Sequence, residues 1–203
     1  MRIILLAAAA LVATPAVAQI GPEPFNGAFV GIQGGWQQDR QTLETQVGNA
    51  LVKASNKKDG FNYGGQIGYD FRVNPSVVFG LEAAITGRTG ETFLDDGFDV
   101  YRLTQGRTIS TTARVGFMTD PQGLVYARGG YANAKFNLDD AGTRFTENRD
   151  GWTVGAGYER AVSQNVSARV EYGYSDFGRD RLGAATDLTY RRHAVNAGLN
   201  FRF

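Results

Sequence analysis

Five ionisable side chains stand within segments of the 203-residue sequence that otherwise carry no charge. Three are arginines and two are glutamates, and each lies three to five residues from the same end of its segment: Glu82, Arg114, Arg128, Arg169 and Glu171. Breaking a buried ion pair by removing one partner costs about 3–5 kcal/mol, so buried charges of both signs at one depth are expected to pair. The spacing therefore predicts one ionic layer inside the folded protein.

Other chemistry is poorly represented. The sequence has no cysteine, which excludes disulfides and thiol catalysis, and His193 is its only histidine. No serine lies within two residues of His193, and Arg191 and Arg192 precede it, so we interpret it as an interfacial histidine at the rim of the fold and not as a general base. We expect no enzymatic activity, no catalytic residue, no cofactor and no metal. The formal net charge of +1 also gives no basic footprint for nucleic acid.

The five charged residues belong to segments in which apolar side chains alternate with polar or small ones. Such segments recur eight times, at 27–36, 61–71, 77–87, 108–117, 124–133, 152–159, 166–174 and 193–203. A period of two is typical of β-strands whose faces meet different environments. The polar face holds all five charges and many of the 27 glycines, as expected for a narrow interior filled by side chains.

Aromatic residues gather at both ends of the apolar face. One group is Trp36, Phe61, Tyr63, Tyr131, Trp152, Tyr172 and Tyr174, and the other is Tyr69, Phe71, Phe79, Phe117, Tyr158, Phe201 and Phe203. Rings are enriched where membrane proteins cross the two lipid–water interfaces. We infer that the apolar face contacts lipid and the charged face lines a lumen.

The connectors between the segments alternate in length. The long ones, expected as polar loops, are 37–60, 88–107, 134–151 and 175–192, and the short ones are 72–76, 118–123 and 160–165. Short turns at one end and long loops at the other are typical of outer-membrane barrels. The fold class predicted is all-β, an eight-stranded antiparallel up-and-down transmembrane β-barrel.

The N-terminal segment has the pattern of a cleaved signal peptide. Arg2 precedes the apolar run 3–13, which is too short to span a bilayer, and Ala16-Val17-Ala18 offers a small-x-small cleavage site. We expect residues 1–18 to be the signal peptide and 19–203 to be the barrel domain. A lipocalin is an alternative, because Gly34-Gly35-Trp36 fits the Gly-x-Trp that opens those secreted barrels, but a lipocalin interior is apolar.

Four segments resemble one family. The stretch 26–36 resembles the first strand of small Gram-negative outer-membrane barrels, and 78–82, 170–178 and 195–203 resemble their third, seventh and eighth strands. The family comprises porin-like, immunogenic outer-membrane proteins with an OmpA-type eight-stranded barrel. The resemblance implies a location in the outer membrane. It also implies that Phe201 and Phe203 form an insertion signal, which the barrel-assembly machinery recognises.

The resemblance further implies a structural or surface-interaction role, and we expect three kinds of partner: outer-membrane lipids, lipopolysaccharide, and host or phage surface factors. Basic residues near the long loops offer contacts for lipid phosphates: Lys53, Lys57, Lys58, Lys135, Arg179, Arg181, Arg191 and Arg192. The alternative function is a narrow passive pore for small solutes, although eight strands leave little room. A lipid-modifying outer-membrane enzyme is a remote alternative, with His193 as its base.

Overall fold

A β-strand structure accounts for almost every residue that can be described. The computed structural model describes residues 23–47, 50–89, 92–95, 100–140, 143–181 and 186–203, so the expected signal peptide at 1–18 lies outside the described residues. The strands are β1 (Gly27–Val47), β2 (Ala50–Asn74), β3 (Val77–Thr89), β4 (Thr92–Asp95), β5 (Val100–Asp120), β6 (Gly123–Asp140), β7 (Thr143–Ala161), β8 (Val166–Arg181) and β9 (Thr186–Arg202). Within these ranges, no helix has the length and hydropathy to cross a membrane.

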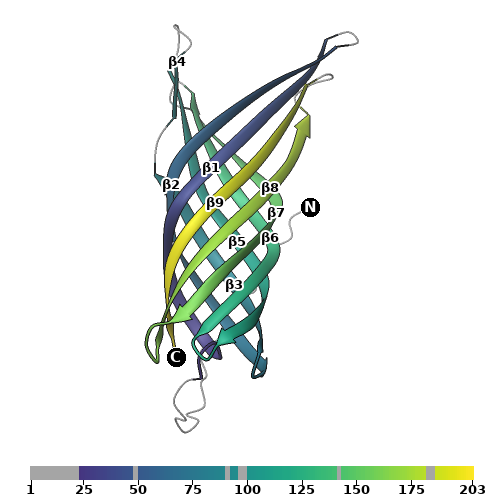
Figure 1. Cartoon of the computed structure of the whole chain (residues 1–203). Helices are drawn as coiled ribbons and strands as arrows, with labels where there is room; N and C mark the ends of the chain where they lie inside the picture. The colour runs from purple at the N-terminus through teal and green to yellow at the C-terminus, as the bar shows by residue number, and fades with distance from the viewer. Residues whose placement is uncertain (1–22, 48–49, 90–91, 96–99, 141–142, 182–185) are drawn as a thin grey trace, which may run out of the picture.

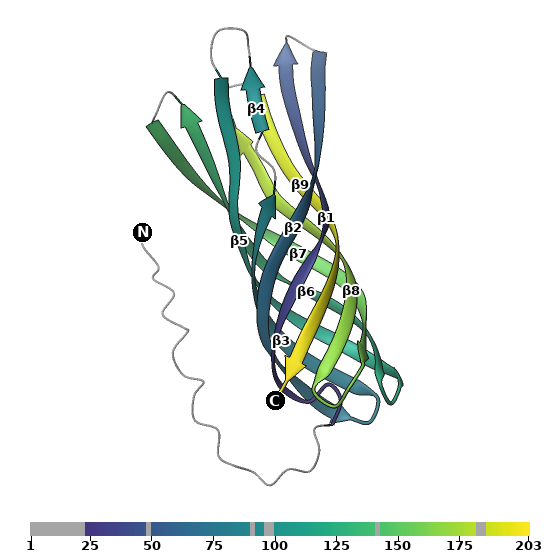
Figure 2. The ribbon, with the colours of Figure 1, turned by 90° about the vertical axis from the view of Figure 1, so that its left-hand side faces the viewer.

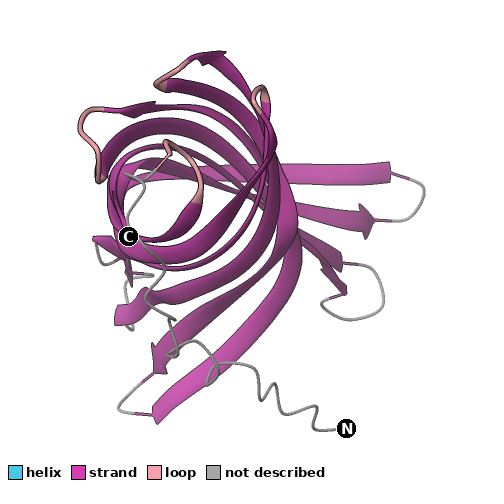
Figure 3. Cartoon of the chain, turned by 90° about the horizontal axis from the view of Figure 1, so that it is seen from below, coloured by secondary structure: helices cyan, strands magenta, loops and turns pink. Residues whose placement is uncertain are grey.

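The strands form one closed antiparallel barrel with eight strand positions around its wall (Figures 1 and 3). Neighbours in sequence pair with each other except β3 and β4, and two further pairings close the sheet: β1 with β9, and β3 with β5. The short β4 pairs with β5 beyond the end of β3, so β3 and β4 together occupy one strand position. Closure satisfies the backbone groups that an open edge would leave unpaired in lipid.

Side chains alternate between the lumen and the outer surface as the sequence predicts. In β3, buried and exposed residues alternate from Val78 to Ile85. The buried set is rich in charged and amide groups, whereas the exposed set is rich in large apolar residues such as Ile32, Phe61 and Leu81. The predicted fold class is confirmed, and the lipocalin alternative is wrong because the lumen is charged and the outer wall is apolar.

The long connectors are the main error in the predicted fold. Strands β1 and β2 stay paired from Gly27↔Asp70 to Val47↔Ala50, through most of the segment predicted as the loop 37–60. The described parts of 134–151 and 175–192 likewise belong to strands, and Figure 2 shows these hairpins extending past the barrel wall. Alternating hydropathy marks a strand only where its two faces meet different environments. The strand extensions carry polar side chains on both faces, so their sequence resembles that of polar loops.

Side chains cap the backbone of the short turns at 72–76 and 118–123. The Asn74 side chain accepts hydrogen bonds from the backbone N–H groups of Ser76 and Val77, each at 2.9 Å. Asp120 accepts one from Gln122 N–H at 2.9 Å, and this bond, with the nearby Arg160 guanidinium, lowers the pKa of the Asp120 carboxyl. Such side-chain caps replace backbone partners at the tips of tight turns.

The C-terminal strand completes the barrel beside the first strand. Arg202 pairs with Phe29, and the Phe203 N–H donates to the carbonyl of Ala28 at 3.1 Å. The rings of Phe201 and Phe203 meet edge-on with centroids 5.3 Å apart, and both lie on the outer wall. The last two aromatic residues are therefore presented to the membrane beside the seam that closes the sheet.

The extended β1–β2 hairpin should be dispensable for folding. Replacing residues 42–55 with Asn-Gly would join the paired Gln41 and Asn56 through a two-residue turn. Because the barrel wall below keeps all its pairings, the shortened protein should still insert and still shift on a gel when heated. Loss of this heat-modifiable band, with an unaltered refolding yield for the full chain, would show that the hairpin belongs to the folding core.

Candidate functional site

The lower lumen holds a closed ring of four charges with alternating sign. Arg114 of β5 donates to both carboxylate oxygens of Asp70 on β2, at 2.9 and 2.5 Å, and to Glu159 of β7 at 2.9 Å. Arg202 of β9 completes the ring, at 2.6 Å from Asp70 and 2.7 Å from Glu159. All four side chains are at most 3% exposed. The ring joins strands from around the barrel and has no net charge.

Neutral polar groups complete the coordination of Glu159. Its Oε1 atom accepts hydrogen bonds from Ser167 Oγ at 2.5 Å and from Asn200 Nδ2 at 2.9 Å. Gln66 in turn donates to the Asn200 side-chain oxygen at 2.7 Å. These bonds satisfy carboxylate lone pairs that the two guanidiniums leave open, as a buried charge requires.

Aromatic rings enclose the arginines of the lower ring. The Phe29 ring centroid lies 5.1 Å from the guanidinium carbon of Arg114 and 5.1 Å from that of Arg202. The Phe25 ring stacks on Arg202 from below at 5.0 Å. Cation–π contacts of this kind strengthen when water is excluded. Phe25 adopts a left-handed backbone conformation with φ of 61°. The complete burial of its ring offsets the cost of this strained conformation.

An apolar floor lies at the short-turn end of the lumen. Its buried members are Phe25, Val78, Leu124 and Tyr126, with Met118 and Ala161 packed against them. Glycines make room for the groups above: a Cβ at Gly68 would overlap the Phe29 ring, and one at Gly80 would overlap Asp70 and crowd Arg114. Glycine is therefore required at these two lumen positions because a larger side chain would collide with the ring and the charged groups.

A second charged layer crosses the middle of the lumen. Arg169 of β8 donates to Glu82 of β3 at 2.5 Å and to Gln33 of β1 at 3.0 Å. Arg128 of β6 lies 3.6 Å from Glu82 and 2.6 Å from Glu171 of β8. The hydroxyl of Tyr126 donates to the other oxygen of Glu171 at 2.9 Å. Two acids and two arginines again balance.

The structure brings together four of the five residues predicted to form one layer. Glu82, Arg128, Arg169 and Glu171 are in contact, whereas Arg114 belongs to the lower ring, so a single layer containing all five is wrong. Barrel strands are tilted and staggered, so equal counts from the strand ends do not give equal heights. Arg114 lies opposite Gly80, two residues from Glu82 along β3.

Three members of the lower ring were missed by sequence reasoning. Asp70, Glu159 and Arg202 lie close to the ends of their predicted segments, where a charge also fits a turn or a membrane interface. Their position on the lumen face, in the same alternation as the charges already identified, was the signal that could have found them.

A third charged cluster occupies the upper lumen. Arg192 of β9 donates to Asp39 of β1 at 2.7 Å and to Thr108 at 3.0 Å, and Arg88 of β3 donates to Asp39 at 3.2 Å. The Phe177 ring stacks on Arg192 at 5.2 Å. The sequence predicts Arg192 as a contact for lipid phosphates. It is not available for that role, because it lies on the lumen face and is 6% exposed.

His193 lies outside the lumen, on the outer wall. It is near the aromatic group that includes Trp36, Trp152 and Tyr172, which is called the upper aromatic group because it lies at the end of the barrel opposite the short turns. The Nδ1 atom of His193 is 2.7 Å from the hydroxyl of Tyr172, and its ring lies 5.1 Å from that of Tyr174. Trp152 packs against Tyr174 at 5.4 Å. In the described part of the chain, no hydrogen bond or ion pair joins His193 to a serine or a carboxylate, so this placement matches that of an interfacial histidine.

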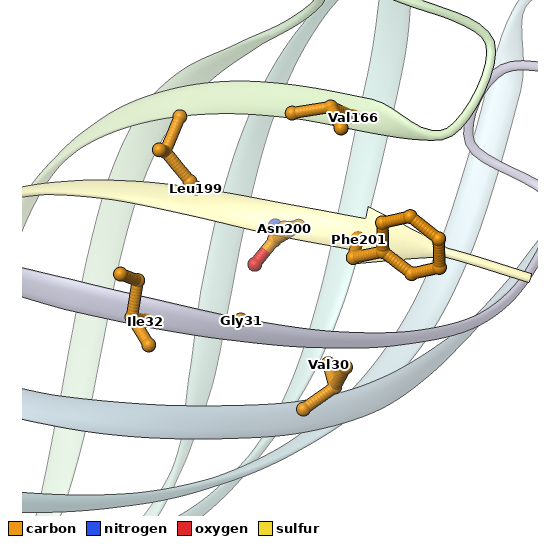
Figure 4. Close-up of a pocket in the computed structure, with 7 residues that line it drawn as sticks. All are labelled: Val30, Gly31, Ile32, Val166, Leu199, Asn200 and Phe201. Carbon is orange, nitrogen blue, oxygen red and sulfur yellow. The ribbon is translucent and has the colours of Figure 1, made fainter.

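A shallow apolar groove of about 330 Å³ runs along the outer wall near the seam between β1 and β9 (Figure 4). Its lining is Val30, Gly31, Ile32, Val166, Leu199, Asn200 and Phe201. Asn200 contributes little polarity because its amide is engaged with Glu159 in the lumen. The groove is a lipid-facing hollow. It offers no group for catalysis, and none of the described residues form a cluster suited to a metal ion.

Comparisons with known proteins agree with this architecture. The family model described as the outer membrane protein beta-barrel domain matches residues 4–203. The chain is 30% identical to the 31 kDa outer-membrane immunogenic protein of Brucella melitensis, over 93% of this chain and 88% of that protein. It is 28% identical to the 22 kDa outer membrane protein of Rhizobium leguminosarum, over 70% of this chain and 67% of that one.

Among solved structures, Neisserial surface protein A shares the fold, with a TM-score of 0.53, 19% identity, and coverage of 88% of this chain and 100% of that chain. The relatives are outer-membrane proteins of Gram-negative bacteria, and the location of this protein is accordingly the outer membrane. The match over nearly the whole chain, together with the closed barrel, shows that the protein belongs to the outer membrane protein beta-barrel family.

Proposed function

We propose that the protein is a non-enzymatic barrel with a structural and surface-interaction role, whose lumen is closed to solutes by its charged layers. The observation that carries the proposal is the ring of Asp70, Arg114, Glu159 and Arg202, which spans the lumen from four strands. An ion entering from above would have to break paired, desolvated charges and then displace the apolar floor. Both steps carry a large free-energy cost.

The outer surface supports the second half of the proposal. The strand extensions carry polar side chains such as Lys53, Lys57 and Asp59 beyond the lipid-facing wall, where they are exposed. The Brucella relatives are named as immunogenic proteins, which fits a surface that is accessible from outside the cell. We propose that this surface contacts lipopolysaccharide and host or phage factors. The wall itself contributes to membrane integrity through its contacts with lipid.

A planar bilayer measurement tests the closed lumen. Wild-type protein refolded into the bilayer should give no stable, large conductance events, because the two lower layers fill the cross-section. Small, regular conductance events from the wild type would support the narrow passive pore, and stable, large events would indicate a wider one. Either result would contradict the proposal.

Substituting Glu82 tests the same layers by stability. Glu82→Ala leaves Arg169 without its carboxylate partner, so the unfolding free energy should fall by about 3–5 kcal/mol, or the barrel should leak ions. The matched control is Glu44→Ala, which breaks the ion pair with Lys53 at 2.7 Å on the exposed hairpin and should cost less than about 1 kcal/mol. Equal effects of the two variants would show that the lumen pairs contribute nothing special.

Deleting Phe203 tests the proposed insertion signal. We propose that the assembly machinery recognises the exposed rings of Phe201 and Phe203 on the last strand. Removing Phe203 should lower the level of folded protein in the outer membrane of cells, while the thermal stability of protein refolded in detergent should change little. Leu199→Ala, on the same face of β9, is the control for lost apolar area. Normal cellular levels after the deletion would argue against the signal.

A further inference from the structure

Three cations stand side by side on the outer surface, just above the lipid-facing wall. In the register of the sheet, Arg40 of β1 lies directly opposite Lys57 of β2 on one side and directly opposite Arg191 of β9 on the other. All three positions fall on the outward face in the strand alternation, and Lys57 and Arg191 are exposed. We call Lys57, Arg40 and Arg191 the cationic row.

Such a row is unfavourable by itself, since like charges directly opposite each other destabilise a sheet. The neighbouring row on the lumen face shows the usual solution. There Asp39 lies between Lys58 and Arg192, so the signs alternate across the same three strands. Higher on the hairpin, Lys53 is likewise matched by Glu44 at 2.7 Å. Of these three rows across β2, β1 and β9, only the cationic row has no anion beside its cations.

The acids around the cationic row do not neutralise it. Asp176 of β8 lies 3.3 Å from Arg191, at one end of the row. Asp59 accepts a hydrogen bond from Gln38 at 3.0 Å. In the described part of the chain, no acidic partner contacts Arg40 or Lys57, and the Arg40 Nε atom is buried without a hydrogen-bond partner. Arg40 is half-buried, and among the described residues no anion balances the positive charge at the centre of the row.

The row lies at the height of the outer lipid headgroups. Directly below it on the same strands, the exposed rings of Trp36 and Phe61 pair with each other and belong to the upper aromatic group. Arg40 is four residues beyond Trp36, about 13 Å along an extended strand. With strands tilted by about 40°, this becomes about 10 Å above the aromatic level, on the water-facing side of the headgroup region that the rings mark.

We propose that Lys57, Arg40 and Arg191 bind the phosphate groups of a phosphorylated glycolipid in the outer leaflet. Arginine binds phosphate through paired N–H donors, and a single phosphate between Arg40 and either neighbour would supply the missing anion. The acyl chains of the same lipid would lie along the apolar wall below, and its sugars beside Trp36. This site rests on the proposed contact with lipopolysaccharide and adds the residues that make it.

The test uses the full chain in phosphatidylcholine nanodiscs, with and without bisphosphorylated lipid A. Native mass spectrometry should detect lipid A retained by the wild type, and Arg40→Gln should weaken this retention about tenfold, as expected for losing one strong charge-assisted contact. Lys53→Gln, on the same hairpin but in a matched pair, should leave retention unchanged. Equal loss from both variants would overturn the site in favour of nonspecific surface charge.

Thermal unfolding gives a second readout that a purely structural role for Arg40 would not produce. Without lipid A, Arg40→Gln should unfold at the same temperature as the wild type or higher, because repulsion is removed. With lipid A, the variant should unfold at a lower temperature than the wild type. A lower temperature in both lipids would overturn the proposal.

The source of the phosphate is tested separately. Inorganic phosphate at millimolar concentration should neither displace lipid A nor raise the unfolding temperature, and protection by free phosphate alone would overturn the assignment to a glycolipid. Failure of the site would leave the closed lumen intact, since the conductance measurement does not involve the cationic row.

Discussion

The structure depends on the closure of the sheet through pairing of β1 with β9. In lipid, unpaired backbone groups have no water to bond with, so a membrane-spanning sheet must have no open edge. Once the sheet is closed with eight strands around its wall, every second side chain points into a space too narrow for bulk water. The polar half of each strand must then be satisfied by other side chains across the lumen, and the charged layers are the result.

The two lower layers follow from this constraint in a specific way. Each contains two carboxylates and two guanidiniums, so neither leaves a net charge in a low-dielectric space. The lower ring is also closed, because each charge in it contacts two of the opposite sign. Buried ion pairs add little net stability compared with apolar packing, but breaking one is costly. The layers are therefore better understood as fixing one arrangement of the strands than as strengthening the barrel.

Much of this arrangement could be predicted from the sequence. Apolar and polar side chains alternate along each strand that contacts lipid, and this pattern indicates whether a residue faces the lipid or the lumen. The inward positions of Glu82, Arg128 and Arg169 follow from parity alone. Height along the barrel does not follow, because it depends on the stagger between strands, and Arg114 was accordingly assigned to the wrong layer. Asp39 and Arg192 were not placed either, because both lie in segments predicted as polar loops, to which the alternation was not applied.

The choice of arginine for the lumen cations follows from geometry. Arg114 and Arg202 each contact two carboxylates on different strands, and Arg169 reaches both Glu82 and Gln33. A planar guanidinium with five donors can hold two partners in fixed directions, whereas a lysine ammonium is a compact charge that keeps its hydration more strongly. The guanidiniums also lie over the rings of Phe25 and Phe29, which seal these charges from water. A lysine at either position would preserve the charge balance but lose both the bridge and the seal.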